Sequence, residues 1–198
     1  MIRFWSYDRE YKKFKKIYLK AINQTLNKGN IFFGDQINSF EKNFIKKYKA
    51  KYGIAVGSGT DALLISLKTL HLRPGDEVIT AANTAIPTIS AIINAGGKPK
   101  LIDIGEDYLI NVKKIQKAIT KKTKAIIPVH LYGQMCEMDK IVKIAKKNKI
   151  IVIEDAAQAI YSKNNDKFLG TIGDLGILSF HQTKNIFCGE GGALLINK

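Results

Sequence analysis

The chain has 198 residues, of which 45% are hydrophobic, and it carries a formal net charge of +15. This length fits one domain or slightly more, and the composition is ordinary for a soluble protein with a real core. No apolar run reaches the roughly 18 residues that span a membrane, and the first eight residues lack the apolar stretch of a signal peptide. The sequence therefore predicts a cytoplasmic protein that does not enter a membrane.

The positive charge raises the question of a nucleic-acid partner. Only three of the 32 basic residues are arginine, at positions 3, 9 and 73, and arginine is the better reader of phosphates and bases. The lysines fall in pairs on expected helix surfaces, as at 46–47, 121–122 and 146–147. A solvated lysine-rich surface is the favoured interpretation, a patch that attracts anionic substrates is an alternative, and no nucleic-acid partner is expected.

Two amphipathic helices, at about 8–27 and 36–48, are expected in an N-terminal segment that covers residues 1–50. From about residue 52 onward, short apolar runs alternate with helical periods. Several of these runs are continuous, as in Ile150-Ile151-Val152-Ile153, which is typical of strands buried on both faces of a parallel sheet. The pattern predicts an α/β domain over residues 51–198 with a mostly parallel sheet flanked by helices. The expected strands are 52–56, 77–80, 99–103, 125–129, 150–154, 175–180 and 192–196, and the expected helices between them are about 60–70, 85–95, 111–121 and 137–148.

Polar residues follow several of the expected strands. They are the turn 57–60, the pair 83–84, His130, Asp155 and, one turn later, Gln158. Ligands of open α/β sheets bind at the carboxyl ends of the strands. This agreement in position predicts a binding site at that edge of the sheet.

The turn Gly57-Ser58-Gly59-Thr60 joins the first strand to a helix. Small residues let the backbone approach an anion, and the free N–H groups at the start of the helix can bind it. The turn is therefore a candidate phosphate site, although an ordinary capped strand-to-helix turn has the same composition. It is not a Walker motif, because the Gly-Lys-Ser/Thr part is missing.

Asp155 directly follows the expected apolar strand 150–154. A carboxylate at this place is costly unless it is paired. It is either a helix N-cap or the charge partner of a protonated ring nitrogen. In the second case the amide of Gln158 could bond a hydroxyl group on the same ring.

Lys184 lies between Phe180 and Ile186-Phe187, and Ser179 precedes it by five residues. Apolar surroundings disfavour the charged amine, and an uncharged amine forms a Schiff base with an aldehyde. Together with Asp155 as a partner for a pyridinium nitrogen, Lys184 indicates pyridoxal 5′-phosphate (PLP) chemistry. Taken alone, it would be read as one surface lysine among many.

No metal site is expected from the sequence. His71, His130 and His181 show no metal-ligand spacing with one another. Cys136 and Cys188 are far apart and predict neither a disulfide framework nor a zinc site.

Taken together, these motifs resemble the DegT/DnrJ/EryC1/StrS family of PLP-dependent nucleotide-sugar aminotransferases. The resemblance runs from about residue 32 to residue 198. Each motif alone is weak, but their order and spacing together are specific. The segments that carry it are 32–34, 57–63, 73–78, 128–134, 154–159 and 179–192.

The resemblance implies the large domain of a fold type I aminotransferase, with a seven-stranded sheet. Lys184 would form the Schiff base with PLP and move a proton between substrate and cofactor carbons. Asp155 would keep the pyridine nitrogen protonated, and Gln158 would contact the ring hydroxyl. The phosphate would be held by Gly59, Thr60 and Ser179.

The implied reaction moves an amino group, usually from glutamate, to a keto group of a nucleotide-linked deoxysugar. Residues 83–88 look most like members that act on 3-keto sugars, which suggests a dTDP-3-keto-6-deoxyhexose as substrate. The family is dimeric with shared sites, so a homodimer is expected for a full-length protein.

The chain departs from the family pattern in two ways. Ala85 stands where the family often has an aromatic residue that stacks on the PLP ring. The chain also stops at Lys198, whereas family members are nearly twice as long, so we expect the C-terminal small domain to be absent.

Three other interpretations stay open. An inactive or regulatory fragment of the same fold would lack turnover. A sugar dehydratase of the same family would carry histidine at the Schiff-base position, where this chain has Lys184. A basic nucleic-acid-binding protein would show tight, salt-dependent and sequence-indifferent binding to DNA.

Overall fold

The computed structural model describes residues 6–198 and contains two units, Met1–Phe40 and Glu41–Lys198. Helix α1 (Tyr7–Asn27) belongs to the first unit and has no buried residue. Helix α2 (Asp35–Tyr48) begins in the first unit and ends in the second. The division at residue 50 that we expect from the sequence stays a prediction.

The part of α2 from Glu41 onward belongs to the second unit and packs within it. Phe44 and Tyr48 are buried, and the backbone N–H of Ala55 donates to Glu41 Oε1 over 2.8 Å. The hydroxyl oxygen of Tyr48 accepts the N–H of Tyr161 at 2.9 Å. Burial raises the pKa of the Tyr48 hydroxyl to about 12, so it stays protonated at neutral pH. These contacts fix the end of α2 against the domain that carries the sheet.

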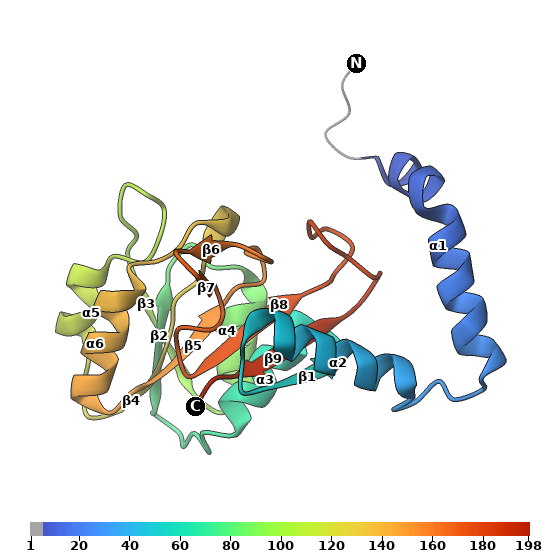
Figure 1. Ribbon diagram of the computed structural model, residues 1–198. Coiled ribbons are helices and arrows are strands. Elements are labelled where there is room, and N and C mark those ends of the chain that lie inside the picture. Colours follow the sequence, from blue (N-terminus) through green and yellow to red (C-terminus); the bar gives the residue numbers. More distant parts are fainter. Residues whose placement is uncertain (1–5) are drawn as a thin grey trace. The chain divides into compact units, whose positions relative to one another are not determined.

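Seven strands form one sheet in the order β1-β9-β8-β5-β4-β2-β3 (Figure 1). Strand β9 is antiparallel to both of its neighbours, and the remaining pairs are parallel. Each of the seven expected strands is confirmed, and their ends shift by at most two residues. The strands are β1 Tyr52–Val56, β2 Glu77–Ala81, β3 Lys98–Ile102, β4 Thr123–Ile127, β5 Ile151–Asp155, β8 Leu175–Ser179 and β9 Gly192–Ile196.

Helices cover both faces of this sheet. Helices α3 (Gly59–Lys68) and α4 (Ile86–Asn94) pack against each other on one side, and α5 (Val112–Ala118) and α6 (Met138–Asn148) lie on the other (Figure 1). Buried isoleucine, valine and leucine side chains of the strands fill the space between the layers. The α/β fold with a mostly parallel sheet is therefore confirmed.

Two local expectations were wrong or incomplete. The helix expected at 111–121 ends at Ala118, because Ile119 is extended and Thr123 Oγ1 accepts the N–H of Thr120 in a turn. A short hairpin of β6 (Lys163–Asn164) and β7 (Lys167–Phe168) was not expected from the sequence. Its strands are two residues long and mostly polar, so the sequence shows no alternation of apolar and polar residues that would predict them.

The order of the strands determines where a ligand can bind. From β2 the chain crosses to β3 at the edge, and then returns over β2 to β4 and onward to β5. The direction in which successive strands are added to the sheet thus reverses between β2 and β4. Such a reversal leaves a crevice outside the carboxyl ends of these two strands. The loops that follow β2, β4, β5 and β8 meet there, together with the start of α3.

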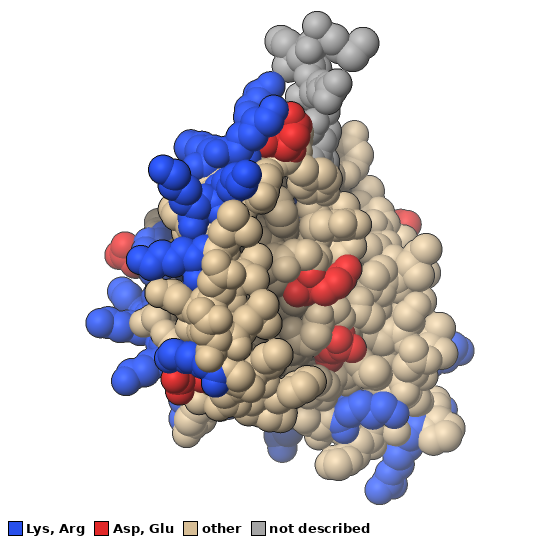
Figure 2. All heavy atoms as spheres, turned by 90° about the vertical axis from the view of Figure 1, so that its right-hand side faces the viewer, with Lys and Arg blue, Asp and Glu red and all other residues tan. Residues whose placement is uncertain are grey.

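Charged side chains are spread over the surface. Figure 2 shows one face of the molecule, on which both basic and acidic side chains are exposed in several separate places. Within residues 6–198, no helix combines the length and the apolar character that crossing a bilayer requires.

Candidate active site

The structure places all seven candidate residues around one cavity of about 330 Å³ at the carboxyl edge of the sheet. They come from five different segments of the chain that lie up to 125 positions apart. Their roles toward a cofactor stay predictions, but their convergence is a property of the fold. The seven residues are Gly59, Thr60, Ala85, Asp155, Gln158, Ser179 and Lys184.

One end of the cavity is the N-terminus of α3. Ser58 is the N-cap: its Oγ accepts the N–H of Asp61 at 3.0 Å and donates to Asp61 Oδ2 at 2.9 Å. The Ser58 hydroxyl is thus engaged in capping, whereas the first N–H groups of a helix, at Gly59 and Thr60, have no acceptor within it. This end of the cavity is suited to an anion.

At this end of the cavity, glycines allow neighbouring segments of the chain to pack closely. A Cβ on Gly59 would lie 2.9 Å from Ser179 Cβ, and a Cβ on Gly192 would lie 2.4 Å from the backbone of Ser58. Real Cβ atoms do not come so near to backbone atoms, so Gly192 must stay a glycine for β9 to pass behind the turn. The same packing brings the Ser179 hydroxyl next to the start of α3.

Asp155 ends β5 and lines the same cavity, and the residue is 5% exposed. Its Oδ1 accepts the N–H of Ala157 at 3.1 Å, and its Oδ2 accepts the hydroxyl of Thr88, also at 3.1 Å. Burial raises the pKa of Asp155, and these two hydrogen bonds oppose the rise. The carboxylate is therefore poised to gain from a cationic partner in the cavity.

The raised pKa of Asp155 gives a prediction for stability. A carboxyl group whose pKa is higher in the folded chain stabilises folding most at low pH, and this contribution is lost as the pH rises through the folded pKa. The side chain of Asp155→Asn does not ionise, so the variant does not lose stability in this way as the pH rises. Without added cofactor, we expect the variant to melt higher at pH 8 by about 2–4 °C, which corresponds to about 1 kcal/mol.

Thermal melts of both proteins between pH 4 and pH 8 test this expectation. The gap between the variant and the wild type should shrink toward pH 4. A gap that is constant, or that widens toward low pH, would contradict the proposed environment of Asp155.

Lys184 lies on the loop between β8 and β9. The base of the loop is closed by the Phe180 N–H, which donates to the Gly191 carbonyl at 2.8 Å, and by the Cys188 N–H, which donates to the Phe180 carbonyl at 3.0 Å. Within the loop, the N–H of Lys184 donates to the His181 carbonyl at 2.8 Å. The Lys184 side chain is half-buried and lines the cavity. The closed base holds the amine near the other candidate residues.

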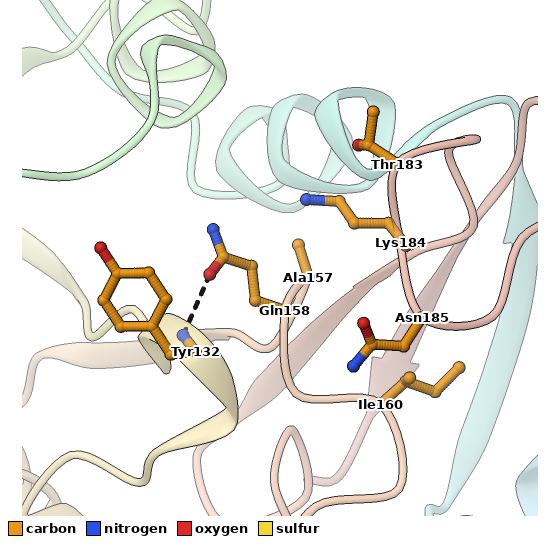
Figure 3. A pocket seen from close by; sticks show the side chains of 7 residues that line it. All are labelled: Tyr132, Ala157, Gln158, Ile160, Thr183, Lys184 and Asn185. Carbon is orange, nitrogen blue, oxygen red and sulfur yellow. Dashed lines mark hydrogen bonds between the residues drawn. The ribbon is translucent and has the colours of Figure 1, made fainter. Parts of the chain in front are cut away.

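Gln158 lines this cavity and also a second, adjoining cavity of about 350 Å³. Its Oε1 accepts the N–H of Tyr132 at 3.0 Å, which leaves the amide NH₂ as the end that can donate (Figure 3). The two cavities share Ala157, Gln158 and Lys184, so they meet at the lysine side chain. The second cavity is also lined by Tyr132, Thr183 and Asn185, whose side chains carry hydroxyl and amide groups (Figure 3).

The wall of the first cavity is aliphatic around Ala85. Among the described residues 6–198, no Phe, Tyr or Trp lines it. Ala85 is the N-cap residue of α4 and stands beside Pro87 in the wall. Because Ala85 has no ring, stacking on a flat ring bound here would be weaker or would come from another residue of the lining, such as His181.

The structure adds Thr88 and Glu190, which the sequence does not single out, and it shows the partner of His130, which is expected at this edge of the sheet. Thr88 is fully buried and bonds Asp155, and His181 and Glu190 line the cavity, with His181 Nε2 3.5 Å from Glu190 Oε1. His130 Nε2 is 2.9 Å from Glu154 Oε2, and both side chains are fully buried. Thr88 lies within the quoted motif 83–88, but no local pattern shows that a threonine reaches a carboxylate 67 residues away.

The sequence profile of the DegT/DnrJ/EryC1/StrS aminotransferase family matches residues 12–198. The chain belongs to this family. SpsC, a spore coat polysaccharide biosynthesis protein of Bacillus subtilis (strain 168), is 41% identical over 177 residues, which cover 89% of this chain and 46% of that protein. The dTDP-3-amino-3,4,6-trideoxy-alpha-D-glucose transaminase of Micromonospora megalomicea subsp. nigra is 34% identical over 195 residues, which cover 98% of this chain and 52% of that protein.

A solved relative supports the fold and the cofactor class of the family. The crystal structure of NtdA from Bacillus subtilis contains bound pyridoxamine phosphate (PMP) and is 40% identical. It superposes with a TM-score of 0.85 and covers 91% of this chain and 41% of that chain. The expected family, the fold type I architecture and a PLP-type cofactor for the family are therefore confirmed. The chain spans about half the length of the curated relatives.

Proposed function

We propose that the chain is the cofactor-binding part of a PLP-dependent sugar aminotransferase. It would move an amino group, with glutamate as the expected donor, to a keto group of a nucleotide-linked deoxysugar. The observation that carries the proposal is the convergence of a lysine amine, a buried carboxylate and a helix N-terminus in one cavity. Membership of the aminotransferase family and the similarity to a dTDP-sugar transaminase support it.

The residues of the cavity fit PLP at each of its chemically distinct ends. The N–H groups of Gly59 and Thr60, with the hydroxyls of Thr60 and Ser179, would bind the phosphate at the start of α3. Asp155 would pair with the ring nitrogen, because burial makes a cationic partner favourable for its carboxylate. The free NH₂ of Gln158 would donate to the ring hydroxyl.

When bound, PLP supplies an electron sink that stabilises negative charge on a substrate carbon. Lys184 would hold the cofactor aldehyde through its amine and, once displaced by the amino donor, would move a proton between carbon atoms. Asp155 would keep the ring nitrogen protonated and so maintain the electron sink. The closed base of the Lys184 loop would keep the amine at the junction of the two cavities.

The second cavity is suited to the substrate. It adjoins the cofactor cavity at Lys184, and Tyr132, Thr183 and Asn185 offer it hydroxyl and amide groups. A sugar that carries several hydroxyl groups matches such a lining. A dTDP-3-keto-6-deoxyhexose is the substrate that residues 83–88 suggest, and we expect a homodimer for the longer protein.

The donor half of the reaction tests this function without knowledge of the sugar. The 198-residue chain is loaded with PLP and incubated with L-glutamate, and 2-oxoglutarate and PMP are measured by chromatography. We expect up to one equivalent of each per chain, well above a control that contains free PLP and no protein. PLP that is bound but yields no 2-oxoglutarate would favour the interpretation of a fragment without turnover.

A further inference from the structure

Thr88 connects the wall of the cavity to its buried carboxylate. It lies in the first turn of α4, and its side chain is fully buried. Its hydroxyl donates to Asp155 Oδ2 at 3.1 Å, and the Thr84 hydroxyl donates to Thr88 Oγ1 at 2.9 Å. A hydroxyl group has a single proton, so a Thr88 that gives its proton to Asp155 must accept the one from Thr84. The chain of hydrogen bonds therefore runs in one direction and ends on the carboxylate.

These hydrogen bonds hold one oxygen of the Asp155 carboxylate. The N–H of Ala157 binds the other oxygen of Asp155, so each oxygen has one partner from the protein. Thr88 is also tied to the cavity wall, since its N–H donates to the Ala85 carbonyl at 3.1 Å. A hydrogen bond to a charged acceptor is about twice as strong as one between neutral groups, and a buried setting strengthens it further.

We propose that Thr88 is a positioning residue that directs Asp155 at the ring nitrogen of the cofactor, and that Thr84 orients the Thr88 hydroxyl. The inference rests on the proposed function, because it concerns the same cavity. It goes further by assigning the alignment of the ring nitrogen's partner to two threonines on another segment. Thr88 acts through Asp155 and does not itself touch the reacting atoms.

A merely structural role for Thr88 makes a different prediction. If Thr88 only satisfies a buried carboxylate, its removal should weaken the binding of any ligand of this shape equally. If it acts through the ring nitrogen, the effect should depend on that nitrogen. The analogue 1-deazapyridoxal 5′-phosphate has a C–H group in place of the nitrogen and otherwise keeps the groups of PLP.

The experiment measures the dissociation constants of PLP and of this analogue by absorbance titration of the 198-residue chain. The variants are Thr88→Val, which keeps the shape and removes the hydroxyl, Thr88→Ser, which keeps the hydroxyl, and Thr84→Val. We expect Thr88→Val to weaken PLP binding by about 10- to 100-fold, the loss of one charge-assisted hydrogen bond. The dissociation constant of PLP for Thr88→Ser should stay within about threefold of the wild-type value, and that for Thr84→Val should lie between the values of Thr88→Ser and Thr88→Val. For the analogue, Thr88→Val should change the dissociation constant by less than about twofold.

The outcomes separate the two proposals. A wild-type chain that binds no PLP would contradict the proposed function, and this inference would fall with it. A wild-type chain that binds PLP, with Thr88→Val binding equally well, would contradict the role of Thr88 alone. Equal weakening for PLP and the analogue would also overturn it, in favour of a structural role. If thermal melts show that Thr88→Val does not fold, Thr88→Ala is compared with Thr88→Ser by the same titrations.

Discussion

Lys184→Ala is expected to lower the transfer of the amino group from L-glutamate by about 10²–10⁴-fold, the range that a positioned acid–base group contributes. Lys184 is the lysine that lines both cavities, so the variant removes the amine from their junction. The contacts proposed to the phosphate, the ring nitrogen and the ring hydroxyl would remain. The variant should therefore still bind PLP, but without a covalent bond to the protein.

A matched control is available on α3. Lys68 is an exposed lysine at the end of that helix, and Lys68→Ala should leave the rate within about twofold of the wild type. Methylamine added to Lys184→Ala should restore part of the activity, because a small amine can occupy the vacated space. A Lys184→Ala rate close to that of Lys68→Ala would assign the chemistry to another residue.

Glu154→Gln is expected to lower the free energy of unfolding by about 2–6 kcal/mol, because it leaves two buried donors unpaired at a cost of about 1–3 kcal/mol each. Glu154 Oε1 accepts the N–H groups of Ile172 and Gly173 at 2.6 and 2.5 Å. Its Oε2 accepts the N–H of Gly170 at 3.0 Å and lies 2.9 Å from His130 Nε2. A glutamine would turn an NH₂ group toward two of these donors and leave them unpaired in the interior.

The His130 ring explains why the carboxylate is required. The N–H of Cys136 donates to His130 Nδ1 at 3.2 Å, so the proton of a neutral ring lies on Nε2 and points to Glu154. The side chains of Glu154 and Asp155 point to opposite faces of β5, as successive side chains of a strand do. Glu154 thus anchors the turn at 170–173 behind the strand that carries Asp155 to the cavity.

Urea unfolding of Glu154→Gln and of Glu137→Gln measures this effect. Glu137 is exposed and forms an ion pair with Lys140 on the surface, so its variant should change stability by less than about 0.5 kcal/mol. A Glu154→Gln chain that is insoluble while Glu137→Gln folds would count as the expected loss. Equal unfolding midpoints for the two variants would contradict the role given to Glu154.

The parts of the fold that follow from sequence are those with a strong local period. Strands β5 and β8 are buried on both faces, so continuous runs of apolar residues mark them, and their ends shift little in the structure. The hairpin of β6 and β7 is short and polar, so it depends on contacts in the folded chain and not on a pattern of apolar residues in the sequence. The end of α5 at Ala118 depends on a turn that Thr123 closes from outside the helix.

Some candidate residues of the site could be named because they follow strands at the same edge of the sheet, whereas Ala85 and Ser179 are named from the family resemblance. Asp155 and the turn 57–60 are visible in this way. Thr88 could not be assigned, because its only signal is a hydrogen bond between segments 67 positions apart. Glu154 looks like one more acidic residue beside Asp155, and only the folded chain shows that it binds the turn at 170–173.

We expect Lys184 to be the residue that binds PLP covalently. The most direct test is to add PLP to the 198-residue chain, reduce the mixture with borohydride, and map the modified peptides by mass spectrometry. We predict a pyridoxyl group on Lys184, at close to one per chain and absent from Lys184→Ala. Label spread over the surface lysines, with none enriched at Lys184 in a folded chain, would contradict the account.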